Sequence, residues 1–352
     1  MSQTVMIEAL GQGTDARTQA LDNIFHWIEP QGIEGRRVLV LLGDVPVQLD
    51  LVERTIRTLS GAARVDLAAR SLAGYDEAYR SALKHLAGER GDLIEIISGE
   101  YESLTVPTRS YARQLHRMET PERRYIKQAF VTRRLAEADL FVVVRRLELN
   151  RFSGVHGVFA TVLDCVPTKT RTEVLSYAAY GLMGEALLDV WSSINGLFLF
   201  GVLDGEYASE ETYGRTAETG VILAGIDPEE LDGYALIASG GRVSWSPFSS
   251  SASARIGRGG RGKPADVVSN IALDELRARV PEGFLQRPPV RGIFNSPPVF
   301  RFSRRPDRFD MLVCPMGAIE EGQNGIPLVR RASCVACGWC LKEYAEVSAS
   351  RR

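Results

Sequence analysis

The stretch of residues 35–69 reads GRRVLVLLGDVPVQLDLVERTIRTLSGAARVDLAA. It opens at a glycine turn, and residues 38–42 are an unbroken run of Val and Leu, which indicates a buried strand. Residues 49–63 place their apolar side chains on one helical face and end near a glycine, and residues 64–69 indicate the next strand. The stretch therefore predicts a strand, a helix and a second strand parallel to the first.

The same alternation of helix and strand continues along the chain. Residues 120–139 predict a helix, because Thr120 suits the N-cap position and Pro121 the first helical position. Further helices and strands are predicted, in chain order, at residues 75–91, 93–98, 140–144, 172–194 and 196–205. The expected fold class is α/β, with a mostly parallel sheet flanked by helices.

The composition is that of an ordinary globular protein, with 352 residues, 45% hydrophobic and 24% charged. A formal net charge of -2 lacks the basic excess that is typical of nucleic-acid binding. No apolar run is long enough to span a membrane, and the N-terminal MSQTVMIEALGQGTDAR is too polar for a signal peptide. We therefore expect a cytoplasmic protein that binds neither nucleic acid nor a membrane.

Two segments interrupt the α/β pattern. Residues 249–266, SSSASARIGRGGRGKPAD, have almost nothing to bury, which predicts either a mobile loop or a linker. Residues 287–310 are rich in Pro and Arg and lead to a cysteine-rich end. We therefore expect an α/β domain at residues 1–286, a connector at 287–310 and a small ferredoxin-like module at 311–352.

Four of the five cysteines lie in the last 39 residues, at Cys314, Cys334, Cys337 and Cys340. The last three have the spacing C-x-x-C-x-x-C, and Cys314 precedes a proline. Each half of a bacterial-type ferredoxin carries C-x-x-C-x-x-C-x-x-x-C-P, and its final cysteine ligates the cluster of the other half. Here the first half keeps only its Cys-Pro and the second only its three close cysteines. One complete set of four thiolates remains, which predicts one 4Fe-4S cluster.

Zinc is the main alternative metal, because four thiolates also suit a tetrahedral structural site. Zinc sites usually pair C-x-x-C with another close pair, so three cysteines in one loop favour iron and sulfur. Three thiols so close together would be open to oxidation without a metal. The fifth cysteine, Cys165, ends an apolar segment and is expected to be buried and inert.

Three stretches together resemble the domain-of-unknown-function family 362. They are ADLFVVVRRLELNRFSGVHGVFATVLD (138–164), LFGVLDGEYASEETYG (199–214) and ILAGIDPEELDGYALIASGG (222–241). The matching positions include Asp204, Gly205, Asp227, Pro228 and Asp232. The resemblance implies a cytoplasmic α/β protein with ferredoxin-like cysteines, and it implies no particular reaction. The sequence departs from the Lys, His and Lys-Asn that family members usually carry, with Glu148, Asn150, Asp164 and Cys165 in those neighbourhoods.

Residues that directly follow strands are the first candidates for a site, because ligands of open parallel sheets bind beyond the carboxyl ends of strands. Asp44 follows the apolar run VLVLLG, and Asp204 and Glu206 follow the apolar run LFLFGVL. His156 lies between glycines in a loop, where we expect it to be exposed and able to act as an acid or base. A local hydrogen bond is its alternative role. These four are the predicted catalytic residues, and they are expected to converge on one crevice.

Four further residues have a predicted role. Lys169 and Arg171 are expected to bind a carboxylate or phosphate of the substrate, with surface solvation as the alternative. Asp227 and Asp232 are expected to cap a helix, because Asp-Pro-Glu-Glu is a strong helix start.

No nicotinamide or flavin fingerprint is present, since no G-x-G-x-x-G follows a strand.

These features favour an iron-sulfur oxidoreductase that relays single electrons between a carrier protein, such as a ferredoxin or flavodoxin, and a small-molecule substrate in the α/β crevice. Two alternatives stay open. One is a non-redox lyase, isomerase or sulfur-transfer enzyme with an open iron site, which requires that Cys314 is not a ligand. The other is a binding or redox-sensing protein that carries the cluster as a scaffold or sensor.

Overall fold

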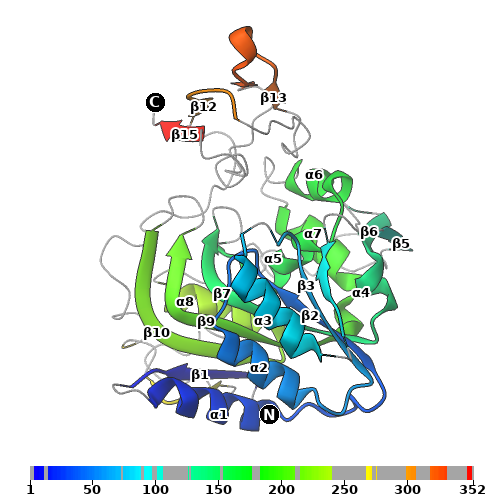
Figure 1. The fold of residues 1–352 in the computed structure, drawn as a ribbon, viewed down its shortest axis with the longest axis vertical. Coiled ribbons are helices and arrows are strands. Elements are labelled where there is room, and N and C mark those ends of the chain that lie inside the picture. The colour runs from blue at the N-terminus through cyan, green and yellow to red at the C-terminus, as the bar shows by residue number, and fades with distance from the viewer. Residues whose placement is uncertain are drawn as a thin grey trace, which may run out of the picture.

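The computed structural model describes residues 4–11, 15–72, 74–88, 91–96, 101–105, 126, 128–150, 154–176, 183–210, 215–239, 267–271, 275, 299–306, 318–330 and 347–350. These residues form a nine-stranded sheet with helices on both faces (Figure 1). The strand order is β11 (Val267–Ser269), β1 (Val5–Ala9), β10 (Arg215–Gly225), β9 (Phe198–Glu210), β7 (Leu140–Asn150), β2 (Arg37–Leu42), β3 (Arg64–Ala69) and β4 (Leu93–Glu95). The ninth strand, β8 (Gly154–Val155), pairs with β7.

The sheet is mostly parallel, as expected. Strands β9, β7, β2, β3 and β4 run in one direction. Strand β10 is antiparallel to both β9 and β1, and β11 adds a parallel strand at the edge. The fold class is therefore α/β.

The helices form two layers, one on each face of the sheet. In front in Figure 1 lie α1 (Ala16–Ile28), α2 (Leu49–Thr58) and α3 (Glu77–Ala87). The other layer contains α4 (Arg133–Glu137), α5 (Val158–Thr161), α6 (Thr168–Ser176), α7 (Met183–Ser192) and α8 (Pro228–Ala238). Alternate residues of β7 serve the two layers, because Val142 packs with the first and Val143 with the second. Burial on both faces explains the unbroken apolar run of this strand.

Three small sheets lie outside the central one. Strand β5 (Tyr101–Thr105) pairs with β6 (Gln128–Thr132), β12 (Val299–Phe302) with β15 (Val347–Ser350), and β13 (Ile319–Glu320) with β14 (Leu328–Val329). In Figure 1, β12, β13 and β15 lie beyond the end of the sheet at which β7 and β9 finish. Within the described ranges, no helix is long and apolar enough to cross a membrane.

The strand–helix–strand prediction for residues 35–69 is confirmed by β2, α2 and β3. The helix predicted at 120–139 is wrong over residues 128–132, which form β6, and only Arg133–Glu137 is helical among its described residues. The reason is a period of two, since Ala129 and Val131 are fully buried whereas Gln128 is exposed. The strict helix–strand alternation also ends at β9, because the next described element, β10, is a strand antiparallel to it.

Candidate functional site

The strand connections create a switch point between the neighbouring parallel strands β2 and β7. From β2 the chain runs through α2 to β3 over one face of the sheet. From β7 it runs through α5, α6 and α7 to β9 over the opposite face, in the opposite direction. Where connections diverge in this way, a crevice opens beyond the carboxyl ends of the strands, and ligands of α/β proteins bind there.

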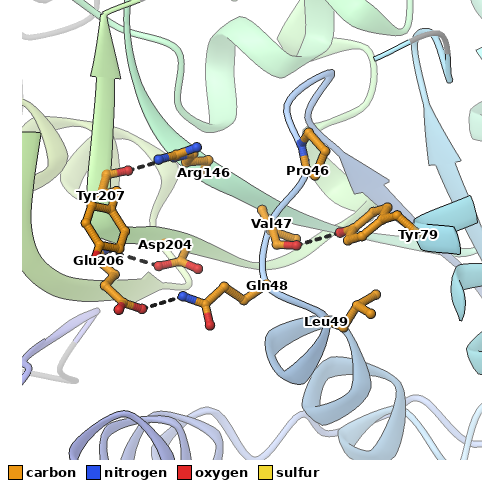
Figure 2. A pocket seen from close by; sticks show the side chains of 9 residues that line it. All are labelled: Pro46, Val47, Gln48, Leu49, Tyr79, Arg146, Asp204, Glu206 and Tyr207. Carbon is orange, nitrogen blue, oxygen red and sulfur yellow. Dashed lines mark hydrogen bonds between the residues drawn. The ribbon is translucent and has the colours of Figure 1, made fainter. Parts of the chain in front are cut away.

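A pocket of about 460 Å³ lies beside this switch point (Figure 2). Its volume is within the range of small-molecule sites, roughly 300–1,000 Å³. The loop from β2 to α2 forms one wall, and β7 and β9 form the opposite wall. The lining residues are Pro46, Val47, Gln48, Leu49, Tyr79, Arg146, Asp204, Glu206 and Tyr207.

Arg17 of α1 holds together three carboxylates at this pocket. Its guanidinium lies 2.7 Å from Asp50, 2.9 Å from Asp204 and 2.9 Å from Glu206. Burial alone would lower the pKa of Arg17, but hydrogen bonds and the charges of Asp50 and Asp204 outweigh burial and raise that pKa above its ordinary value. Arg17 therefore stays charged and fixes the position of Asp204 and Glu206.

Two tyrosines of the α3 region fix the loop that forms the opposite wall. The Tyr75 hydroxyl donates to the Gly43 carbonyl, and the Tyr79 hydroxyl donates to the Val47 carbonyl at 2.6 Å. Burial is the main cause that raises the pKa of both tyrosines, so each hydroxyl remains a donor. Gln48, held at the end of this loop, donates from its side-chain amide to Glu206.

Arg146 brings the opposite charge to the pocket. It stands opposite Asp204 in the parallel pairing of β7 with β9, and its Nε donates to the Tyr207 carbonyl at 2.8 Å. Figure 2 shows Arg146 and Glu206 toward opposite ends of the wall formed by these strands. The pocket can therefore offer hydrogen-bond donors with a positive charge at one end and acceptors with a negative charge at the other.

A second charged cluster is buried on the other face of the sheet. The guanidinium of Arg145 has no exposed surface and lies 2.8 Å from Glu148, 3.3 Å from Asp164 and 2.7 Å from the Thr161 hydroxyl. Burial opposes its charge, but Glu148 and Asp164 raise the pKa of Arg145 overall. His156 Nε2 lies 3.4 Å from Asp164. This cluster ties β7 to the segment around α5.

The structure brings together two of the four predicted catalytic residues at the pocket, Asp204 and Glu206. The expected exposure of His156 is wrong, since only 3% of this residue is exposed. Its backbone N–H donates to the Glu148 carbonyl at 2.7 Å, because β8 folds back onto β7 and carries the histidine inward. Asp44 lies 3.5 Å from Arg70 and is not among the pocket lining. Convergence of all four on one crevice is therefore not observed.

Arg171 does not face the pocket. It is buried, and its guanidinium donates to the carbonyls of Leu163, at 2.6 and 2.9 Å, and Val166, at 3.3 Å. These donors satisfy carbonyls at the end of a helical segment, which is a structural role. Lys169 belongs to α6, but its side chain is outside the described part of the structure.

The capping predictions for two aspartates are confirmed, with one difference. Asp227 is the N-cap of α8 and accepts from the backbone of Glu229 at 2.9 Å. Asp232, however, lies inside α8 and caps a different helix, since its carboxylate accepts from Val158 N–H at 2.7 Å and from the next residue of α5. A Cβ at Gly157 would lie only 1.9 Å from Asp232 Oδ1, so this contact requires glycine. Burial raises the pKa of Asp232 to about 7.

Cys165 is fully buried, and burial raises the pKa of its thiol, as expected of an inert cysteine. The predicted cluster ligands Cys314, Cys334, Cys337 and Cys340 lie outside the described residues, and so does the segment 249–266. Within the parts that the structure describes, no group of three or more His, Cys, Asp and Glu could hold a metal.

Sequence reasoning missed several residues that line the pocket, namely Gln48, Tyr79, Arg146 and Tyr207. It also missed Arg17, which binds two of the lining carboxylates, Asp204 and Glu206. The sequence contains a signal for Arg146, because this residue follows the apolar part of β7 just as Asp204 follows the apolar part of β9. The sequence contains no such signal for Arg17, because its partner Asp204 is 187 positions away.

No protein-family model matches the chain, and no curated protein matches it. A solved structure to which it is similar is the lactate racemase apoprotein from Thermoanaerobacterium thermosaccharolyticum, with 11% sequence identity and a TM-score of 0.41. The match covers 68% of this chain and 57% of the racemase chain, and a likeness of this size carries no argument about function. The resemblance to the domain-of-unknown-function family 362 stays a prediction.

Proposed function

We propose that this protein binds one 4Fe-4S cluster and relays single electrons between a carrier protein, such as a ferredoxin or flavodoxin, and a small molecule in the pocket at the switch point. The proposed ligands are Cys314, Cys334, Cys337 and Cys340. The observation that carries the proposal is their spacing, in which two incomplete ferredoxin half-motifs retain every ligand of one cluster.

The hairpin between the cysteines supports Cys314 as the fourth ligand. Strands β13 and β14 are antiparallel, with Ile319 opposite Val329, and the backbone N–H of Arg330 donates to the Ala318 carbonyl at 2.7 Å. Cys314 precedes Ile319 by five positions, and Cys334 follows Val329 by five positions. Both segments leave the same end of the hairpin, so an equal length of chain separates each cysteine from a paired residue. The two thiolates are therefore within chain reach of each other.

The strands that flank the cysteines in the sequence also pair with or contact one another. Strand β12, which precedes Cys314, pairs with β15, which follows Cys340, and β12 contacts β14. All four cysteines are thus bracketed by strands of one small assembly, as a single cluster site requires. This arrangement favours closed coordination by four thiolates over an open iron.

A closed cluster leaves no iron free to bind substrate, so electron transfer to a small molecule needs a separate binding site. The pocket lined by Asp204, Glu206 and Arg146 is a candidate for this site. Strands β12, β13 and β15 lie beyond the same end of the sheet as the ends of β7 and β9 (Figure 1). This shared side supports a relay between the two parts.

Replacement of Cys314 by alanine separates the electron relay from open-iron chemistry. We expect anaerobically purified Cys314→Ala to lose most of its iron and acid-labile sulfide, because a ligand of the cluster is removed. Cys165→Ala is the matched control and should keep a wild-type iron content, since Cys165 is buried in the α/β core. A Cys314→Ala protein that keeps a stable cluster would instead support the open-iron alternative.

A further inference from the structure

The pocket at the switch point has groups of opposite charge that the described part of the protein does not engage. The guanidinium of Arg146 uses its Nε for the Tyr207 carbonyl, and its two terminal nitrogens make no hydrogen bond or ion pair with described residues. Glu206 uses its Oε2 for Arg17 and Gln48, and its Oε1 accepts from no described residue. Donors and an acceptor therefore remain available to a ligand.

The neighbouring Asp204 does not neutralise Arg146, although the two stand opposite each other on β7 and β9. Asp204 instead accepts two hydrogen bonds from the guanidinium of Arg17, at 2.9 and 3.2 Å. It also accepts a hydrogen bond from the backbone N–H of Glu206. Asp50, Asp204 and Glu206 carry three negative charges against one positive charge on Arg17, which leaves a formal excess of two negative charges on that side. The pocket is thus dipolar.

We propose that this pocket binds a small zwitterion of the amino-acid type. The carboxylate of the ligand is held by the terminal nitrogens of Arg146, whose planar fork suits bidentate contact with a carboxylate. The ammonium group is held by Glu206, within the negative field of the three acidic residues. This inference rests on the proposed function only in taking the pocket as the substrate site.

The rest of the lining indicates an apolar substituent on the zwitterion. The loop wall contributes Pro46, Val47 and Leu49, and the ring of Tyr79 completes it. On the strand wall, Tyr207 is 44% exposed, which leaves a ring face open for contact with an ammonium group or an apolar group. An amino acid with an aromatic or branched side chain satisfies both the charged and the apolar parts of the pocket.

Calorimetric titration of the full-length protein with the twenty standard amino acids tests this inference. L-phenylalanine is compared with 3-phenylpropionate, which lacks the ammonium group, and with phenethylamine, which lacks the carboxylate. We expect at least one amino acid with an apolar side chain to bind, and each analogue that lacks one charge to bind about tenfold more weakly or worse. Absence of binding across the panel overturns the inference, and so does an analogue that binds as tightly as its parent.

Two variants assign the charges to their residues. Arg146→Gln should weaken binding of the amino acid and of 3-phenylpropionate about tenfold or more and leave phenethylamine unchanged. Glu206→Gln should weaken binding of the amino acid and of phenethylamine by a similar factor and leave 3-phenylpropionate unchanged. Arg57→Gln, at an exposed ion pair with Glu53, is the matched control and should bind like wild type. Equal losses for all three ligands in either pocket variant contradict the assignment. These titrations need no cluster chemistry, so their outcome is independent of the iron content that tests the proposed function.

Discussion

Among single residues, Asp232 gives this protein a stability that depends on pH. Its carboxylate is buried, and its pKa is raised to about 7, whereas an aspartate in an unfolded chain titrates near a pKa of about 3.9. Between these two values the folded state holds a proton that the unfolded state lacks. The free energy of unfolding contributed by Asp232 therefore falls as the pH rises from about 4 to about 7, and the destabilising effect is complete above that range.

Asp232→Asn removes this titration. In wild type, the free energy of unfolding should fall with pH between pH 4 and 7, by up to about 1.4 kcal/mol per pH unit more than in the variant. Urea unfolding followed by tryptophan fluorescence, repeated across this pH range, measures the difference. Asp139→Asn is the control, because a backbone hydrogen bond from Arg37 lowers the pKa of Asp139 and moves its titration below this range. Identical slopes for wild type and Asp232→Asn would show that the carboxylate does not titrate as described.

At the scale of elements, the packing of β9 against α5 and α8 depends on Gly201. A Cβ at this position would lie 2.8 Å from a methyl group of Val158 and 2.9 Å from one of Leu231. We expect Gly201→Ala to lower the free energy of unfolding by about 1–3 kcal/mol through overpacking, as measured by urea denaturation. Gly196→Ala should change it by about 0.5 kcal/mol or less, because a Cβ there meets nothing within 4 Å. Equal effects at the two sites would refute this explanation.

Some strands of this protein could be predicted from the sequence, and others could not. Strands β2 and β7 were predictable because both of their faces are covered, which requires apolar residues without interruption. Strand β6 was not, because its alternation spans five residues next to a sequence that favours helix. Strand β1 contains Glu8, which is buried against Asn23 and Asn270, and no local pattern reveals such distant partners.

For the whole molecule, the sequence predicted the α/β architecture and two residues of the pocket, Asp204 and Glu206. Both follow the apolar run LFLFGVL, so the rule that ligands bind beyond carboxyl ends of strands was enough to select them, although β9 continues past both residues to Glu210. The position of the pocket depends on the order of strands, which places β7 between β2 and β9. Contacts such as that of Arg17 with Asp204 appear only when this order is known.

Metal and sulfide analysis of the full-length protein, prepared without oxygen, tests whether the C-terminal cysteines hold one 4Fe-4S cluster. We expect about four irons and four acid-labile sulfides per chain, with a paramagnetic resonance signal of a reduced 4Fe-4S cluster after dithionite treatment. About one zinc per chain with no labile sulfide would contradict it.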